Sequence, residues 1–321
     1  METREWQAAA AVLRAAAQDA ALRRHIQKDP VLSGLLDRAA KRYIVGAKAG
    51  DAVHAGQKLM DWGYGISLQY MRECADDHYK SAMAKAETLT LIRAAGAAGL
   101  IGSVISIDLS HLGLDVSEAL AYEHMLEIVQ EAGLYDMRVM ISGEETFRTD
   151  GILALYQAVR KQYAHVGITL QANLHRTEAD LERLLANGSG CFRLVKGAYA
   201  VTPDAALPRS EALNDRYLQL ADKALAAGSR VSIASHDEAL IEEAARRGYL
   251  ARPEVEIEML YGIRPELLRR WKSEGVPARA YVLYGEEWFL YVCHRMAEHP
   301  PNLIAAIADM AKTVEIESLY R

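Results

Sequence analysis

The sequence predicts an α/β protein built as a distorted (β/α)8 barrel, TIM-like, with an N-terminal helical segment. Eight short apolar segments alternate with eight segments of amphipathic helical pattern over roughly 230 residues, which matches that fold in number and length. Parallel strands need long crossover connections, and eight of them can close the sheet on itself. An open doubly wound sheet is the alternative, but no GxGxxG follows the first predicted strand.

The first 60 residues predict helices, because alanine, arginine and glutamine are frequent and apolar residues recur at helical spacing. The helical segments expected there are 6–29, which Pro30 should end, 31–45 and 54–62. No linker or low-complexity segment divides the chain. We therefore expect one domain over residues 1–321, with accessory helices over 1–60 and the barrel over 65–305.

Short apolar runs rich in β-branched residues predict the strands, and the longer amphipathic segments between them predict the helices. The predicted strands are Ile66–Met71, Ser103–Leu109, Met137–Ile141, Gly167–Ala172, Cys191–Val195, Arg230–Ser235, Glu254–Met259 and Arg279–Leu283. The predicted helices are 75–97, 117–132, 151–162, 178–186, 210–227, 238–247, 265–274 and 287–298, with a last helix after Asn302.

Composition limits the classes of function. A chain of 321 residues, 51% of them hydrophobic, can bury a large core. The net charge of -6, with both signs interspersed, argues against sequence-independent binding to nucleic acid. The sequence contains no run of about 18 uncharged apolar residues, so no transmembrane segment is predicted. The N-terminus lacks the apolar core of a signal peptide, and a cytoplasmic location is therefore expected.

Cysteine and histidine usage predicts no metal site. The three cysteines lie far apart and form no CxxC pair, and the ten histidines show no HExxH or similar spacing. We expect the cysteines to be reduced thiols in core or pocket positions.

The segment CFRLVKGAYA, residues 191–200, is the most informative stretch of the chain. The predicted strand Cys191–Val195 is apolar except for Arg193 in its middle, and Lys196 and Gly197 follow it directly. The backbone at the small residue Gly197 therefore lies beside two cationic donors. A large flat ligand could approach such a backbone closely, with its electron-rich atoms facing the donors. Taken alone, the segment also agrees with a buried strand that has a basic end.

In a barrel of this kind the chemistry lies at the C-terminal ends of the strands. Polar and aromatic residues gather at these predicted ends and on the eighth helix, where burial without partners would be costly. We therefore predict a ligand site at this rim. Its candidate residues are Glu73, Asp108, Ser142, Glu144, Gln171, Asn173, Arg193, Lys196, Tyr199, Ser235, His236, Asp237, Tyr261, Tyr281, Tyr284, Tyr291, His294, Arg295 and Glu298.

These residues and their surroundings resemble the proline dehydrogenase family, flavoenzymes that oxidise L-proline to pyrroline-5-carboxylate on a distorted (β/α)8 barrel. The resemblance runs from about residue 40 to residue 305, in the order and spacing of the family. The segments that carry it are ISIDLSHLGLD (105–115), VGITLQANLHRTEADLERLL (166–185), FRLVKGAYA (192–200), IASHDEALIEEA (233–244), EIEMLYGI (256–263) and YVLYGEEWFLYVCHRMAEHPPN (281–302).

The resemblance implies bound FAD. All positions that match the FAD contacts of the family carry the family's residues: Gln171, Arg193, Val195, Lys196, Gly197, Ala198, His236 and Glu298. In the family the arginine of RLVKG lies on the N5 side of the flavin, where a positive donor stabilises the reduced anionic ring. Tyr199, Tyr281 and Tyr291 match tyrosines that line the substrate pocket of the family.

The substrate half departs from the family. A lysine in strand 2 and two adjacent arginines in helix 8 hold the proline carboxylate in the family, whereas here Asp108 and His294 replace the lysine and the first arginine, and Arg295 remains. Ser142 replaces a strand-3 aspartate, and Asn173 replaces the tyrosine of QAYL. With Asp108 in place of lysine, an attraction to the proline carboxylate on the order of 4 kcal/mol near a protein surface becomes a repulsion. His294 lacks the bidentate fork with which arginine binds a carboxylate.

Three functions agree with this pattern. The favoured one is an FAD-dependent oxidoreductase with an altered pocket, which oxidises the C–N or N–N bond of a small amine or imino acid to an imine-type product. Asp108 would hold a cationic nitrogen, His294 would act as acid or base, and a quinone or oxygen would accept the electrons. An ordinary L-proline dehydrogenase is the alternative, and a non-catalytic flavin-binding protein is the second alternative.

Overall fold

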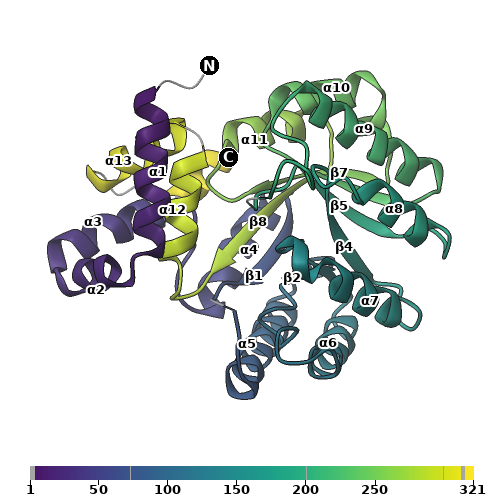
Figure 1. The fold of residues 1–321 in the computed structure, drawn as a ribbon, viewed down its shortest axis with the longest axis horizontal. Coiled ribbons are helices and arrows are strands. Elements are labelled where there is room, and N and C mark those ends of the chain that lie inside the picture. Colours follow the sequence, from purple (N-terminus) through teal and green to yellow (C-terminus); the bar gives the residue numbers. More distant parts are fainter. Residues whose placement is uncertain (1–3, 73, 200, 299, 312–314) are drawn as a thin grey trace.

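Eight parallel strands form a closed barrel in chain order, with β1 paired to both β2 and β8 (Figure 1). The computed structural model describes residues 4–72, 74–199, 201–298, 300–311 and 315–321, so Glu73 of the predicted rim lies outside the described residues. The strands are β1 (Gly65–Tyr70), β2 (Val104–Ile107), β3 (Arg138–Ile141), β4 (Val166–Gln171), β5 (Cys191–Val195), β6 (Arg230–Ala234), β7 (Val255–Leu260) and β8 (Ala278–Tyr284). The predicted barrel is confirmed.

Successive side chains point to opposite faces of a strand, and the outward ones are mostly apolar whereas several inward ones are polar. On the outer face, residues such as Ile105, Leu194 and Ile257 are fully buried against the surrounding helices. On the inner face, Arg193 and Glu258 are buried together at the middle of the barrel. The barrel interior is therefore polar at the level below its mouth.

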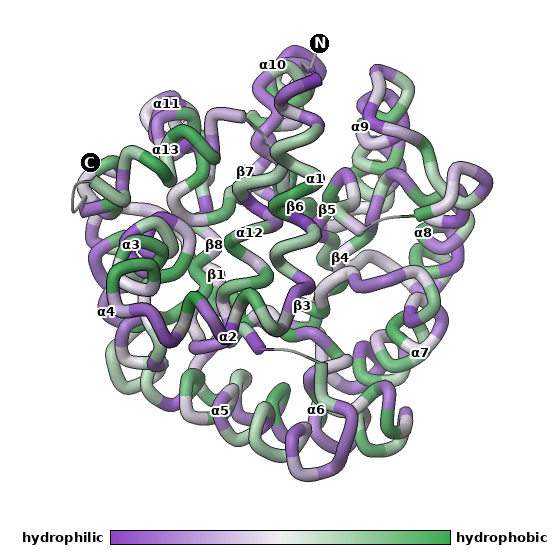
Figure 2. The backbone as a smooth tube through the Cα atoms, turned by 60° about the vertical axis from the view of Figure 1, so that its left-hand side comes forward, coloured by the Kyte–Doolittle hydropathy of each residue, from purple (hydrophilic) through white to green (hydrophobic). Residues whose placement is uncertain are grey.

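The barrel helices surround the strands, and Figure 2 shows both hydrophobic and hydrophilic residues along each of them. They are α4 (Ala49–Asp61), α5 (His78–Ala97), α6 (Glu118–Gly133), α7 (Thr149–Arg160), α8 (Thr177–Leu185), α9 (Glu211–Ala226), α10 (Glu238–Arg246), α11 (Pro265–Ser273) and α12 (Phe289–Glu298). Several begin at a side-chain cap: Asp77, Ser117, Ser210 and Asp237 each accept a hydrogen bond from a backbone N–H of the first turn. These caps satisfy amides that the helix leaves free.

The N-terminal segment comprises three helices, α1 (Arg4–Gln18), α2 (Ala20–Lys28) and α3 (Pro30–Ala40). The single helix expected over 6–29 is therefore wrong, because the Asp19 carboxylate accepts from the amides of Ala21 and Leu22 and starts a new helix there. Pro30 occupies the first turn of α3, after the cap residue Asp29, where its missing N–H costs nothing.

The N-terminal segment packs on the C-terminal helices rather than on the barrel wall. In Figure 1, α1 lies beside α12, and α3 contacts α13 (Pro300–Ala311), which begins at Pro300 and not after Asn302 as expected. Arg42 forms a two-pronged ion pair with the buried carboxylate of Asp309, at 2.5 Å from Nε and 3.0 Å from Nη2. This arrangement holds α12, the helix that carries Arg295, from its outer side.

No helix among the described residues is long and apolar enough to cross a membrane. All three cysteines are free thiols. Cys293 is buried as expected, whereas Cys74 is exposed, because it lies in the loop that follows β1.

Candidate active site

A buried ion pair between β5 and β7 forms the floor of the site. The Arg193 side chain donates through Nε to Glu258 Oε2 at 2.6 Å and through Nη2 to Oε1 at 2.8 Å. Both side chains are almost fully buried, at 3% and 2% exposure. Such a fork is the strongest geometry available to a guanidinium and a carboxylate, and it fixes the plane of Arg193 across the barrel.

Three inward-facing serines complete this pair. Ser67 donates to Glu258 Oε1 at 2.5 Å, Ser232 donates to Oε2 at 2.8 Å, and Ser106 Oγ accepts from Arg193 Nη2 at 3.0 Å. Burial raises the pKa of Glu258, but the charge and hydrogen bonds of Arg193 outweigh burial and hold this pKa at about 2. The pair is therefore fully ionised at neutral pH.

Asp108 is connected to the ion pair through a residue that the sequence did not single out. The amide of Gln69 donates to Asp108 Oδ1 at 2.8 Å, and its oxygen accepts from the Tyr281 hydroxyl. The Tyr281 ring in turn lies under the Arg193 guanidinium, 4.7 Å from its central carbon. Gln69 is the inward residue two positions after Ser67 on β1, so strict strand alternation was the signal that could have found it.

Glu144 is a second carboxyl group beside Asp108. Its Oε1 accepts from the Ser110 amide at 3.1 Å, and its Oε2 lies 3.8 Å from Arg148 Nη1. Burial first, and then the charge of Asp108, raise the pKa of Glu144 to about 7. The site thus contains, beside Asp108, a carboxyl group that exchanges its proton near neutral pH.

This carboxyl group predicts a pH-dependent stability. Between pH 4.5 and 7 the unfolded chain releases the Glu144 proton while the folded chain retains it, so the free energy of unfolding falls as pH rises through this window. Glu144→Gln should abolish that fall and gain on the order of 3 kcal/mol relative to the unmodified protein between pH 5 and pH 8. Urea unfolding at the two pH values measures it. Glu145→Gln, at the half-exposed neighbour, is the control, and an equal gain there would contradict the assignment.

Four predicted site residues carry buried polar atoms that have no hydrogen-bond partner within the described part of the chain. These atoms are Ser142 Oγ, Asn173 Oδ1, Tyr291 OH and Arg295 Nε. Buried polar groups are nearly always satisfied in native proteins. Five further atoms of this kind lie on other described residues, which are Thr169, Asn214, Arg216, Arg270 and Trp271. The four on Ser142, Asn173, Tyr291 and Arg295 belong to the predicted mouth, where a ligand with both donors and acceptors would satisfy them.

Most of the predicted cofactor residues lie in or just after β4, β5 and β6, and Glu298 lies at the end of α12. Gln171 Nε2 donates to the Glu144 carbonyl at 2.8 Å, and Lys196 is paired with Asp237, the cap of α10. Burial lowers the pKa of His236 to about 3, and its neutral ring accepts at Nε2 from the Leu260 amide at 3.0 Å. Gln171 thus connects the predicted cofactor residues to the loop that carries Glu144.

The backbone after β5 comes close to β4. Gly197 has a φ of 101°, and a Cβ on it would lie 2.0 Å from Asn173 Oδ1, so only glycine fits here without displacement. Val195 and Gly197 are half-buried, while Ala198 is exposed. Arg209 donates to the Gly197 carbonyl at 2.7 Å and closes this loop on itself.

Helix α12 carries four of the predicted site residues. Tyr291, Arg295 and Glu298 share one face, where Arg295 is paired with Glu298 and stacks 5.3 Å from the Tyr291 ring. His294 lies about 100° around the helix axis from Arg295 but only about 60° from Tyr291 and about 40° from Glu298, so it lies at the edge of the same face. Burial first, and then the charges of Arg295 and of Arg14 of α1, lower the pKa of His294. The acid–base role expected for His294 stays a prediction.

Two other residues of the predicted rim do not face the mouth. Tyr284 is an outward residue of β8, because the inward positions are Arg279, Tyr281 and Leu283, and its hydroxyl donates to Glu87 on α5. Tyr261 stacks on Tyr320 with ring centroids 5.7 Å apart. Both expectations were wrong because the alternation of side chains was not followed to the strand ends.

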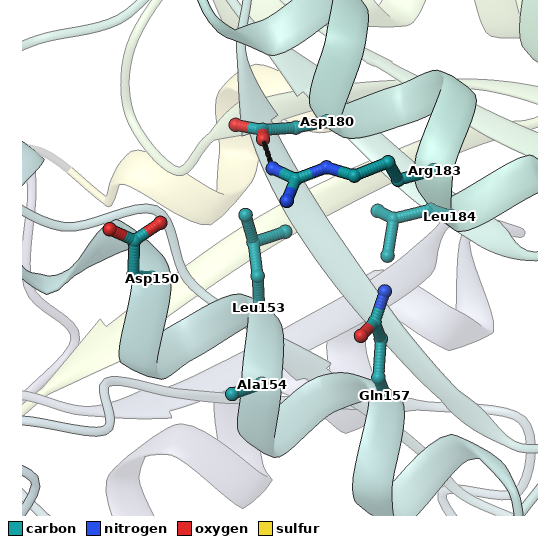
Figure 3. Close-up of a pocket in the computed structure, with 7 residues that line it drawn as sticks. All are labelled: Asp150, Leu153, Ala154, Gln157, Asp180, Arg183 and Leu184. Carbon is teal, nitrogen blue, oxygen red and sulfur yellow. Dashed lines mark hydrogen bonds and ion pairs between the residues drawn. The ribbon is translucent and has the colours of Figure 1, made fainter.

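Two cavities lie elsewhere. One of about 150 Å³ lies on the barrel exterior between α7 and α8, where Asp180 and Arg183 of α8 are paired with each other at its edge (Figure 3). The other, of about 190 Å³, lies between the N-terminal segment and the loop before α12, next to Trp288. Neither contains a residue of the predicted site, so the chemistry of the mouth, and not the cavity volume, locates the site.

Known proteins with similar sequences match this chain over most of its length and over most of their own. Proline dehydrogenase 2 of Bacillus subtilis (strain 168) is 31% identical over 277 residues, covering 85% of this chain and 91% of the relative. Proline dehydrogenase of Deinococcus radiodurans is 31% identical over 284 residues, covering 85% and 90%.

Solved structures with the same fold belong to longer proteins. Proline utilization A (PutA) from Bdellovibrio bacteriovorus superposes with a TM-score of 0.77 at 17% identity, and this chain covers 39% of its length. A Bradyrhizobium japonicum PutA gives a TM-score of 0.70 at 18% identity, with 33% of its length covered. The family model described as proline dehydrogenase matches residues 52–298. The chain therefore belongs to the proline dehydrogenase family and is a flavin-dependent dehydrogenase that acts on CH–NH donors.

Proposed function

We propose that the protein binds FAD and oxidises the C–N bond of a cyclic secondary amine, with L-proline as the substrate that its relatives support best. The observation that carries the proposal is the cluster of buried, unpartnered polar atoms on Ser142, Asn173, Tyr291 and Arg295. The donor chemistry fits a flavin and a small polar substrate, since Arg193, Lys196 and Gln171 supply N–H groups beside a glycine backbone.

The proposed mechanism assigns a role to each half of the site. FAD, when bound, supplies the two-electron acceptor that turns the amine into an imine. Arg193 presents a fixed positive group on the floor of the site, and Lys196, Gln171 and His236 hold the cofactor. An amine gives up electrons only with its lone pair free, so the Asp108 and Glu144 pair is assigned to hold the protonated nitrogen and accept its proton. A quinone or oxygen is the proposed acceptor of the electrons.

The pair of carboxyl groups supports a second candidate, a cyclic amine without a carboxylate. Asp108 and Glu144 attract an ammonium group and repel a carboxylate, and Arg295 already has Glu298 as its partner. The relatives favour L-proline over this altered pocket. The charge of the pocket is the only feature that favours the second candidate.

Anaerobic titration tests both candidates. We expect purified protein to be yellow with FAD, and the flavin absorbance to be bleached by L-proline or by pyrrolidine. Bleaching by L-proline at lower concentration supports the first candidate, and the reverse order supports the second. FAD that is reduced by dithionite but by neither compound would contradict amine oxidation, and protein that cannot be reconstituted with FAD would contradict the cofactor.

A further inference from the structure

The carboxylate of Glu258 is saturated by four donors. Arg193 Nε and Ser232 Oγ both donate to Oε2, and Arg193 Nη2 and Ser67 Oγ both donate to Oε1, all within 2.5–2.8 Å. This number equals the lone-pair sites of a carboxylate. The side chain is 2% exposed, so neither water nor salt screens its charge.

Arg193 uses only part of its donor set on this pair. Nε and Nη2 make all of its hydrogen bonds to Glu258, Ser67 and Ser106, and no partner is found for Nη1 among the residues that the structure describes. The guanidinium is therefore held rigidly by one edge while the other edge stays available. Its positive charge is balanced at contact distance by Glu258.

We propose that Glu258 is a positioning residue that neutralises Arg193 and so limits how strongly this arginine stabilises the reduced, anionic flavin. The inference rests on the proposed function, which puts FAD above Arg193. An uncompensated guanidinium in a buried site attracts negative charge over several ångströms, whereas a contact ion pair acts only as a dipole. Glu258 thereby keeps the flavin reactive toward its electron acceptor.

The same strand supplies a matched control. Glu256 lies two residues earlier on β7, also faces inward, and is paired with Arg279 at 3.0 Å through Nε and Nη2. Two residues on one strand are about 6.6 Å apart, and Glu256 is on the side away from the mouth. Glu256→Gln removes a carboxylate of similar chemistry without touching Arg193.

The test compares FAD-loaded wild type, Glu258→Gln and Glu256→Gln. Sulfite, an anion that adds to flavin N5, reports the positive charge near that atom, and its dissociation constant is measured by absorbance. We expect sulfite to bind about tenfold more tightly to Glu258→Gln, with a midpoint potential shifted upward, and less than twofold differently to Glu256→Gln. Loaded Glu258→Gln with wild-type sulfite affinity and potential would overturn the inference, while wild type that retains no FAD would overturn the proposed function beneath it.

A second variant applies if Glu258→Gln does not fold. Ser232→Ala removes one donor from Oε2 and leaves every charge paired. The Ser232 O–H dipole then no longer offsets part of the negative charge of Glu258, so we expect sulfite to bind about twofold more weakly, the opposite direction. Tighter or unchanged binding in Ser232→Ala would count against Glu258 as the balancing charge.

Discussion

Arg193→Met is expected to lower the free energy of unfolding of the ligand-free protein by about 3–5 kcal/mol, because it leaves the Glu258 carboxylate buried without a counter-ion. Two serine hydroxyls remain on that carboxylate, and they replace only part of the lost interaction. Methionine also cannot donate the two hydrogen bonds by which Arg193 joins β5 to Glu258 of β7. Urea unfolding at pH 7 measures the change.

A double variant isolates the cause of this loss. Arg193→Met combined with Glu258→Gln should recover more than half of the stability, since a neutral amide tolerates burial with its serine partners better than an unpaired charge. Arg138→Met is the control, because Arg138 lies 3.9 Å from Glu256, which keeps Arg279 as its partner. A cost below about 1 kcal/mol for Arg193→Met would mean that the pair does not stabilise the barrel.

Asp108→Lys is expected to raise the ratio of kcat/KM for L-proline to that for pyrrolidine by about a hundredfold. The substitution replaces a carboxylate beside the substrate by an ammonium group, so that repulsion of the proline carboxylate becomes attraction. It also gives Glu144 a cationic neighbour in place of Asp108, the second cause of its raised pKa. Steady-state kinetics with both compounds measure the ratio, which cancels general effects of the variant on FAD binding.

His294→Arg is the informative comparison. Because His294 lies at the edge of the α12 face that carries Tyr291 and Arg295, and because the substitution does not remove a carboxylate, this variant should change the ratio less than Asp108→Lys. A larger effect from His294→Arg would mean that position 294, and not Asp108, lies closer to the carboxylate of the substrate. If unmodified protein already prefers L-proline over pyrrolidine by several orders of magnitude, the two carboxyl groups do not repel the proline carboxylate, and the second candidate is contradicted.

The sequence by itself determined the order of elements and the composition of the barrel mouth. Strands such as Cys191–Val195 were predicted to the residue, because an apolar run between Gly190 and Lys196 has few other conformations available. Helix starts were readable where Ser117, Ser210 or Asp237 provides a cap. The gathering of polar residues at strand ends followed from closure of a parallel barrel, which needs no side-chain detail.

Only the tertiary structure decided which of these residues meet. Glu258 lies 65 positions from Arg193 in the chain, and nothing local to either residue indicates that they share a fork. The partner of Asp108, Gln69, and the raised pKa of Glu144 likewise depend on burial between separate strands and loops. Local sequence sets backbone preference and alternation, whereas contacts across a barrel depend on the register between strands that lie far apart in the chain, which no single segment encodes.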